Sequence, residues 1–167
     1  YTKDMKTLLT AQKDITTATI PDGVTKIGEN AFKDCTALTN ITIPNSVTEI
    51  GFFTFSGCEN LEYNEYGNAL YIGNADNPYL ILVKAKDTSI TSCEINNDTK
   101  IILYAAFDGC KNVETLAIGD GITSFDNLPI TPALKEITIG KGITSICDYA
   151  FFNCKNLENI TIPDNVT

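Results

Sequence analysis

Six cysteines are the residues of this 167-residue sequence with the greatest potential for chemistry. Four of them recur at one position of a repeated pattern, three residues after a phenylalanine: Cys35, Cys58, Cys110 and Cys154. Four thiolates could hold a zinc ion, and a single thiolate could act as a nucleophile. Equivalent positions of stacked repeats lie along a line and do not converge on a metal, and the chain has no histidine to serve as a base. We therefore predict a buried column of free thiols, with a disulfide as the less favoured alternative.

Acidic and amide side chains are the second group with chemical potential. Four glutamates lie on or beside segments with strand spacing: Glu94, Glu114, Glu136 and Glu158. A glycosidase needs two carboxyl groups at a set separation in a cleft, whereas the surface expected here is open and hydrated. Two groups of oxygen-bearing residues could bind calcium: Asn74, Asp76 and Asn77, and Asn96, Asn97 and Asp98. Because Asn and Asp also favour turns, we predict no catalytic residue, no cofactor and no metal site, and calcium stays an open alternative.

The charge of the chain narrows the classes of partner. The formal net charge is -9 and the isoelectric point is near 4.4. Nucleic acids and anionic membrane surfaces both require clustered Lys and Arg, so neither is expected as a partner. The chain also lacks an apolar run of about 18 residues, which predicts that this segment does not insert directly into a membrane.

The elements that must position these residues follow from an internal repeat. Ile20 to Leu38 and Ile43 to Leu61 carry the same pattern, and every matched position is separated by 23 residues. A fixed period of this length is the signature of a solenoid, in which each coil packs only against its neighbours. The pattern predicts one domain over residues 1–167 with about seven coils, and its abrupt ends suggest a piece of a longer protein.

One segment of each coil has strand spacing. Ile15-x-x-Ala18-x-Ile20 recurs as Leu38-x-x-Ile41-x-Ile43 and four more times, and its last three residues alternate between inward and outward positions. Successive copies are expected to pair in parallel and to form a sheet on one face. The outward position then forms one column: Thr19, Thr42, Glu94, Ala117, Thr138 and Thr161.

The opposite wall is expected to contain short turns or strands and single helical turns. Phe32 and Cys35 stand three residues apart, as their equivalents do in other coils, which fits one turn of helix with both side chains on one face. Two coils depart from the period. Residues 118–138 form a short coil without the Phe-x-x-Cys pair, and residues 63–89 form an enlarged coil that is expected to carry a hairpin.

The repeated unit Ile-Pro-x-x-Val-Thr-x-Ile-Gly-x-x-Ala-Phe-x-x-Cys-x-x-Leu resembles the BspA-type (Treponema pallidum-type) leucine-rich repeat. Its copies span Ile20 to Leu38, Ile43 to Leu61, Ile95 to Val113 and Ile139 to Leu157. The resemblance implies an α/β leucine-rich-repeat solenoid dominated by strands. It also implies a cell-surface or secreted protein of gut or oral bacteria or of trichomonad parasites, with adhesion to matrix proteins such as fibronectin or to other cells. Asn96, Thr99, Leu103 and Cys147 depart from the motif.

Two surfaces are candidates for protein binding. One is the strand face, with Thr42, Glu94, Thr138 and Thr161 outward, and the other is the enlarged coil, with Tyr66, Tyr71 and Tyr79. A plain hydrated sheet and tyrosines that pack the coil interior are the competing interpretations. We predict a non-enzymatic module of a bacterial or protist surface protein that binds a protein ligand, in the host matrix or on another cell. A structural spacer that presents another domain is the alternative.

Overall fold

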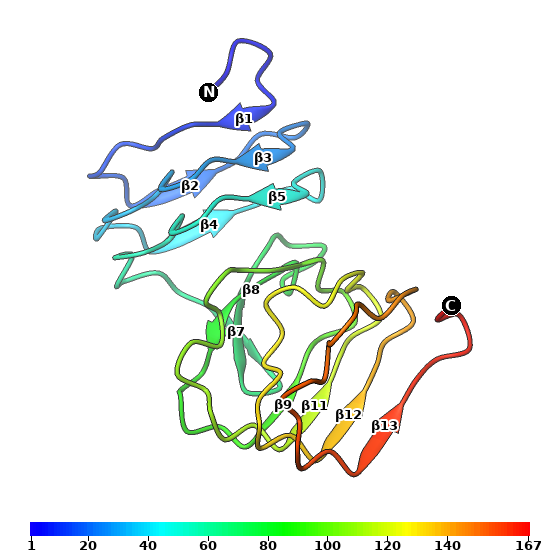
Figure 1. The fold of residues 1–167 in the computed structure, drawn as a ribbon. Helices are drawn as coiled ribbons and strands as arrows, with labels where there is room; N and C mark the ends of the chain where they lie inside the picture. Colours follow the sequence, from blue (N-terminus) through cyan, green and yellow to red (C-terminus); the bar gives the residue numbers. More distant parts are fainter. The chain divides into compact units, whose positions relative to one another are not determined.

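The computed structural model describes residues 1–167 and contains thirteen short β-strands and no helix. The chain divides into two compact units, residues 1–64 with 72–80, and residues 65–71 with 81–167. Both units are built from strand-dominated solenoid coils, about seven turns in all. The strands and their order along the chain are drawn in Figure 1.

The first unit contains two parallel sheets. β2 (Thr17–Thr19) pairs with β4 (Asn40–Thr42), with Thr19 opposite Thr42. On the other wall, β3 (Lys26–Ile27) lies between β1 (Thr7–Leu8) and β5 (Glu49–Ile50). Matched positions of the 23-residue repeat therefore stand side by side, as the period predicts.

The second unit contains the longer parallel sheet. Its strands are β9 (Ser92–Glu94), β11 (Thr115–Ala117), β12 (Glu136–Thr138) and β13 (Asn159–Thr161), in that order. The central residues of β9, β11 and β12 are Cys93, Leu116 and Ile137, respectively, and all three are buried. The residues on either side of it are turned outward, because side chains alternate along a strand. The predicted parallel pairing and the inward position of Cys93 are confirmed.

The enlarged coil contributes a second sheet. Its strands are β6 (Asn64–Tyr66), β7 (Ala69–Ile72), β8 (Ile81–Ala85) and β10 (Ile101–Ile102), with β7 between β6 and β8. The turn that leads from β7 towards β8 uses its own side chains, since Asn74 Oδ1 accepts hydrogen bonds from the N–H groups of Asp76 and Asn77 at 3.0 and 2.8 Å. These contacts give a conformational reason for the Asn and Asp residues of this turn.

The predicted single helical turns are wrong, and with them the α part of the predicted α/β class. Phe32 and Cys35 lie in successive tight turns, in which the Cys35 N–H bonds the Phe32 carbonyl at 3.0 Å. Asn30 and Asp34 have φ angles of 57° and 59°, in the left-handed region. A helical turn needs consecutive right-handed residues, so left-handed residues on both sides of Phe32 exclude it.

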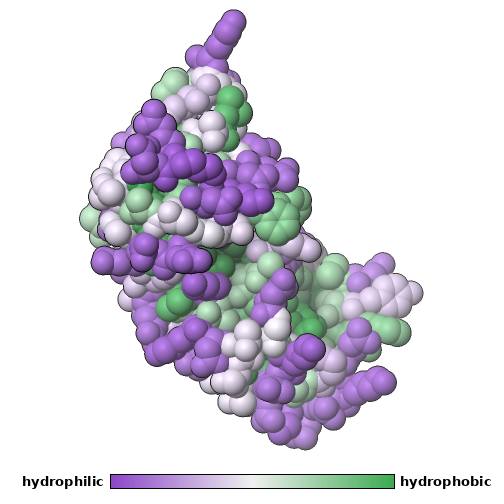
Figure 2. All heavy atoms as spheres, turned by 90° about the vertical axis from the view of Figure 1, so that its left-hand side faces the viewer, coloured by the Kyte–Doolittle hydropathy of each residue, from purple (hydrophilic) through white to green (hydrophobic).

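The tight turns still place the large apolar side chains inward. Phe32 is 2% exposed, and its ring stacks on that of Phe55 with centroids 5.5 Å apart and planes inclined by 16°. Cys35 and Cys58 are also buried, and the Cys58 Sγ atom lies 3.1 Å from the Phe32 carbonyl oxygen. The face drawn in Figure 2 is covered largely by hydrophilic side chains, with hydrophobic residues between them.

Candidate protein-binding groove

The outward column predicted from the sequence exists within each unit. In the second unit, the parallel registers place Glu94 beside Ala117, Ala117 beside Thr138, and Thr138 beside Thr161. Glu94, Thr138 and Thr161 are exposed. In the first unit Thr42 lies beside Thr19 and is half-buried, because its other side bridges to Gly73. The outward faces of these sheets are therefore accessible to a ligand. That they bind a protein stays a prediction.

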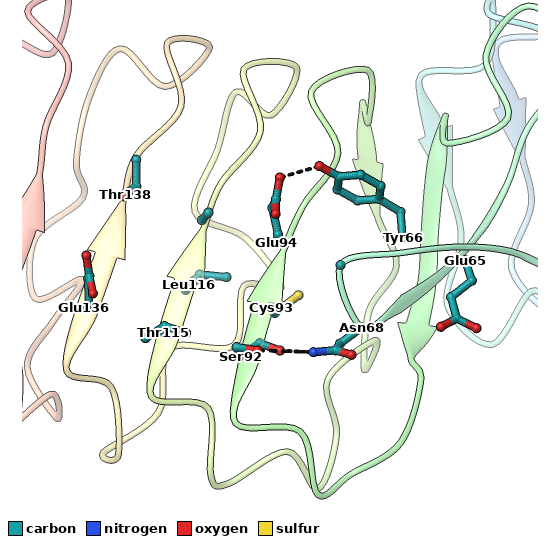
Figure 3. A pocket seen from close by; sticks show the side chains of 12 residues that line it. Glu65, Tyr66, Asn68, Ser92, Cys93, Glu94, Thr115, Leu116, Glu136 and Thr138 are labelled. Atoms are coloured by element: carbon teal, nitrogen blue, oxygen red, sulfur yellow. Dashed lines mark hydrogen bonds between the residues drawn. The ribbon is translucent and has the colours of Figure 1, made fainter.

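A groove of about 700 Å³ lies over the sheet of the second unit. Its floor is formed by β9, β11 and β12, and one wall is formed by residues 65–68 of the enlarged coil (Figure 3). Of the predicted binding residues, it brings together Glu94, Thr138 and Tyr66. Thr161 stands on the next strand beside Thr138 and does not line the groove.

Gly67 allows the wall to lie directly against the sheet. Its φ angle is 55°, and a Cβ atom at this position would stand 1.9 Å from the Glu94 carbonyl oxygen. The Gly67 carbonyl accepts the Glu94 N–H at 3.0 Å. Glycine adopts the left-handed conformation without steric cost, and the close approach leaves no space for a Cβ atom at this position.

Side chains of the wall complete its attachment to β9. The Tyr66 hydroxyl donates a hydrogen bond to the Glu94 carboxylate, and the Asn68 amide donates to the Ser92 carbonyl oxygen at 3.0 Å (Figure 3). Glu65 forms an ion pair with Lys86. Because main-chain and side-chain contacts act together, the wall is positioned by the fold before any ligand binds.

The groove carries an excess of negative charge. Its lining includes Glu65, Glu94 and Glu136 and no Lys or Arg. The carboxylate of Glu65 is compensated by Lys86, whereas Glu94 accepts a hydrogen bond from a neutral phenol and Glu136 forms no ion pair. Two uncompensated carboxylates therefore face the groove.

The placement of these carboxylates differs from that of a glycosidase. Glu94 and Glu136 lie two strands apart and two residues apart along the strand direction. With strands about 4.8 Å apart and a rise of about 3.3 Å per residue, their Cα atoms are about 12 Å apart. Glycosidases hold their paired carboxyl groups on opposite sides of the bond that they cleave, whereas Glu94 and Glu136 are exposed on the same face of one sheet. The arrangement fits recognition of separated positive charges better than hydrolysis.

The tyrosines of the enlarged coil have different surroundings. Tyr71 is 0% exposed, so the prediction that it belongs to a binding surface is wrong. It occupies an inward position of β7, where the ring fills the interior, and burial raises the pKa of its hydroxyl. Tyr79 is half-buried in the first unit, at the end of the Asn74 turn, and its N–H bonds Asn77 Oδ1 at 3.1 Å.

A smaller hollow of about 400 Å³ lies in the first unit. Thr42, Tyr63 and Asn74 are among its lining residues. The Asn74 side chain donates to the carbonyl oxygen of Ile43, the residue that follows β4, at 2.7 Å. Thr42 lines this hollow and does not line the groove of the second unit.

Cys35, Cys58, Cys93 and Cys110 are buried, whereas Cys154 is half-buried and Cys147 is exposed, so the predicted buried column holds for three of its four members. All six are free thiols. The Cys58 thiol donates to the Phe32 carbonyl oxygen at 3.1 Å, and Cys35 makes the same kind of contact with the Gln12 carbonyl oxygen at 3.5 Å. Burial raises the pKa of Cys35 and Cys58, and raises that of Cys93 to about 12. A raised pKa keeps the thiol in its neutral form near pH 7, and the neutral thiol is a poor nucleophile and a poor metal ligand.

No three His, Cys, Asp or Glu side chains are gathered as a potential metal site. The structure contains no helix with the length and hydrophobicity of a membrane span.

Sequence reasoning missed several residues of the groove. Gly67, Asn68, Ser92 and Thr115 were not predicted, and Glu136 was identified only as a carboxylate beside the sheet. Ser92, Thr115 and Glu136 form the second outward column, two residues before the predicted one, so strand alternation alone could have found them. The Gly67-Asn68 turn signal was visible, but its contact with β9 depends on the folding of the enlarged coil.

Comparisons with known proteins agree with the repeat pattern. The family model described as BspA type Leucine rich repeat region matches in six copies, over residues 8–75 and 85–167. The chain therefore belongs to the BspA-type leucine-rich repeat family, and the predicted resemblance is confirmed. This repeat is typically a non-catalytic fold for protein interaction. No curated protein matches the chain in a sequence search.

Solved structures with a similar chain are bacterial leucine-rich repeat proteins. The Treponema pallidum leucine-rich repeat protein is 19% identical, with a TM-score of 0.45, and the match covers 98% of this chain and 78% of that one. A Bacteroides ovatus leucine-rich repeat protein is 23% identical, with a TM-score of 0.38 and coverage of 96% and 49%. A leucine-rich cell surface protein of Faecalibacterium prausnitzii is 23% identical, with a TM-score of 0.34, and this chain, 89% covered, spans 60% of its length.

Proposed function

We propose that the chain is a non-enzymatic protein-binding module of a bacterial cell-surface protein and that it mediates adhesion to host matrix or to another cell. Membership of the BspA-type family supports this proposal. The single observation that carries it is the groove of the second unit, a preformed hollow floored by three strands and lined mainly by polar side chains. Solenoids use broad sheet faces of this kind for protein ligands.

The test is a binding screen of the whole chain against purified extracellular-matrix and cell-surface proteins. Thr115 and Thr138 are exposed on the floor of the groove, so Thr115→Arg and Thr138→Arg would obstruct it without disturbing the core. Thr123 is exposed outside the groove, and Thr123→Arg is the matched control. Saturable binding that both floor variants lose and the control retains would support the proposal.

The alternative is a structural spacer, which has no ligand of its own. It predicts that no protein in the screen binds, while thermal unfolding shows the chain to be folded. Binding that all three arginine variants retain would instead exclude the groove as the site and would leave the rest of the surface to be searched.

A further inference from the structure

We propose that the groove of the second unit recognises an extended peptide segment that carries two Lys or Arg side chains four residues apart. This inference rests on the proposed function and adds the chemistry of the ligand. It follows from the charges that line the groove, from the register that separates them, and from the wall that closes the sheet edge.

The charges of the lining favour a cationic partner. Glu94 and Glu136 are both exposed at the groove and lack an ion-pair partner, and no Lys or Arg lines it. An ammonium or guanidinium group placed beside either carboxylate would form a charge-assisted hydrogen bond. A neutral or acidic ligand would leave both carboxylates uncompensated or would be repelled.

The geometry selects an extended peptide with a particular spacing. The register places the Cα atoms of Glu94 and Glu136 about 12 Å apart along a diagonal of the sheet. In an extended chain, residues i and i+4 point to the same side and stand about 13 Å apart, whereas i and i+2 stand only about 6.7 Å apart. Two basic residues four positions apart therefore match the carboxylates.

The floor between the carboxylates accommodates the intervening residues. Ala117 lies in the column between Glu94 and Thr138, where the other outward positions carry Thr or Glu, and it leaves a local depression. Thr115 and Thr138 offer hydroxyl groups on either side of it, and both are exposed. The middle residue of the segment, i+2, turns to the same side as the two basic residues, and its side chain would lie above Ala117.

The wall determines how the segment binds. The Gly67 carbonyl already accepts the Glu94 N–H, and Asn68 already occupies the Ser92 carbonyl oxygen, so the edge of β9 is closed. A ligand cannot add a strand there by backbone hydrogen bonds. Binding must therefore depend on contacts between side chains over the sheet face. The electrostatic part of the binding free energy must decrease as the salt concentration increases.

The probe is a pair of synthetic, end-capped peptides of identical composition. In one peptide two lysines are four positions apart, and in the other they are adjacent, so that an extended chain turns them to opposite sides. Each is titrated to about 1 mM against the whole chain, with Kd measured from amide shifts. We expect the first peptide to bind at least about threefold more tightly, with shifts centred on Ala117 and Thr138.

Variants that replace glutamate by glutamine distinguish attraction to the groove from attraction to the net negative charge of the chain. Glu94→Gln with Glu136→Gln should weaken binding about three- to tenfold, since each exposed pair contributes modestly. The matched control is Glu29→Gln with Glu59→Gln, which removes the same charge from exposed positions of the first unit. The control should bind as the unchanged chain does, and about 1 M salt should abolish the preference for the spaced peptide.

The outcomes distinguish this inference from the function on which it rests. Equal Kd values for the two peptides, or equal weakening by both pairs of variants, would refute it, because attraction to an acidic protein would then be non-specific. If neither peptide binds while the screen finds a protein ligand, the cationic ligand is excluded and the binding function stands. If neither peptide nor any protein binds, both proposals fail.

Discussion

Replacing Gly67 by alanine tests whether the groove is built by close contact between the enlarged coil and β9. An added Cβ atom would stand 1.9 Å from the Glu94 carbonyl oxygen and 2.9 Å from its Cβ atom. The backbone on one side must therefore move by roughly 1 Å. That movement would lengthen the hydrogen bond from the Glu94 N–H to the Gly67 carbonyl, now 3.0 Å.

The expected loss of stability has two parts. An alanine held in the left-handed region costs about 1–2 kcal/mol, and the weakened backbone hydrogen bond costs about another 1–2 kcal/mol. Gly67→Ala should therefore lower the free energy of unfolding by about 2–4 kcal/mol. Gly109→Ala is the matched control, because Gly109 also has a positive φ, 80°, but its Cβ would meet only the Thr88 side chain, with the methyl carbon at 3.1 Å, and no backbone atom. It should lose only the conformational part.

Urea unfolding followed by circular dichroism measures both variants, and hydrogen exchange measures the Glu94 amide. The Gly67→Ala variant should lose more stability than Gly109→Ala and should exchange the Glu94 amide faster relative to the rest of β9. If the two variants lose the same stability and Glu94 keeps its protection, the wall is not held by this contact. The groove would then not be preformed by the fold.

Three further predictions concern the core and the turns. Burial raises the pKa of Cys93 to about 12 from about 9 in the unfolded chain, so the folded state binds the thiol proton more tightly. The contribution of Cys93 to stability is therefore complete below about pH 9 and is lost between about pH 9 and 12. Urea unfolding measured over this pH range should show a smaller fall in stability for Cys93→Ala than for the unchanged chain. Tyr149 is 81% exposed with a φ of 61°, where the equivalent residue is Asn30, and its ring contacts Phe152 with centroids 6.1 Å apart. In a Phe152→Ala background, which removes that contact, Tyr149→Asn should raise the unfolding free energy by about 0.5–1 kcal/mol in the same assay, since asparagine tolerates this conformation better; a loss would contradict the presence of strain at Tyr149. Phe32→Ala should cost about 3–5 kcal/mol because the cavity also removes the stacking on Phe55; a loss below about 1 kcal/mol would show that the turn is not part of the cooperative core.

The sequence predicted the family and the strand face because the relevant signals are local. The recurrence of Ile20 at Ile43 and the alternation around Thr42 require no knowledge of distant contacts. The same reasoning failed at Phe32 and Cys35, where a spacing of three fits both a helical turn and two tight turns. Only the left-handed φ angles of Asn30 and Asp34 distinguish them. Asparagine and aspartate tolerate that region, but their presence does not require it.

Tyr71 shows a second limit of local reasoning. Its position in a tyrosine-rich segment suggested an interface, yet it alternates inward on β7 and is fully buried. A binding assay on Tyr71→Ala would report the loss of a core side chain, so Tyr66 at the groove is the more informative position. In the other coils, alignment with the repeat identifies which residues point inward. The enlarged coil does not follow the 23-residue period, so this alignment could not be applied to Tyr71.

By itself, the sequence determined the repeat, the order of the coils and the outward column that contains Glu94 and Thr138, because a coil of fixed length stacks equivalent residues in register. Only the tertiary structure decided that this column lies in a groove. The wall at Gly67 reaches β9 from a segment more than 20 residues earlier in the chain, and Tyr66 and Asn68 bind residues 28 and 24 positions away. Such contacts depend on how the enlarged coil folds back against β9. No local sequence pattern predicts contacts between residues so far apart in the chain.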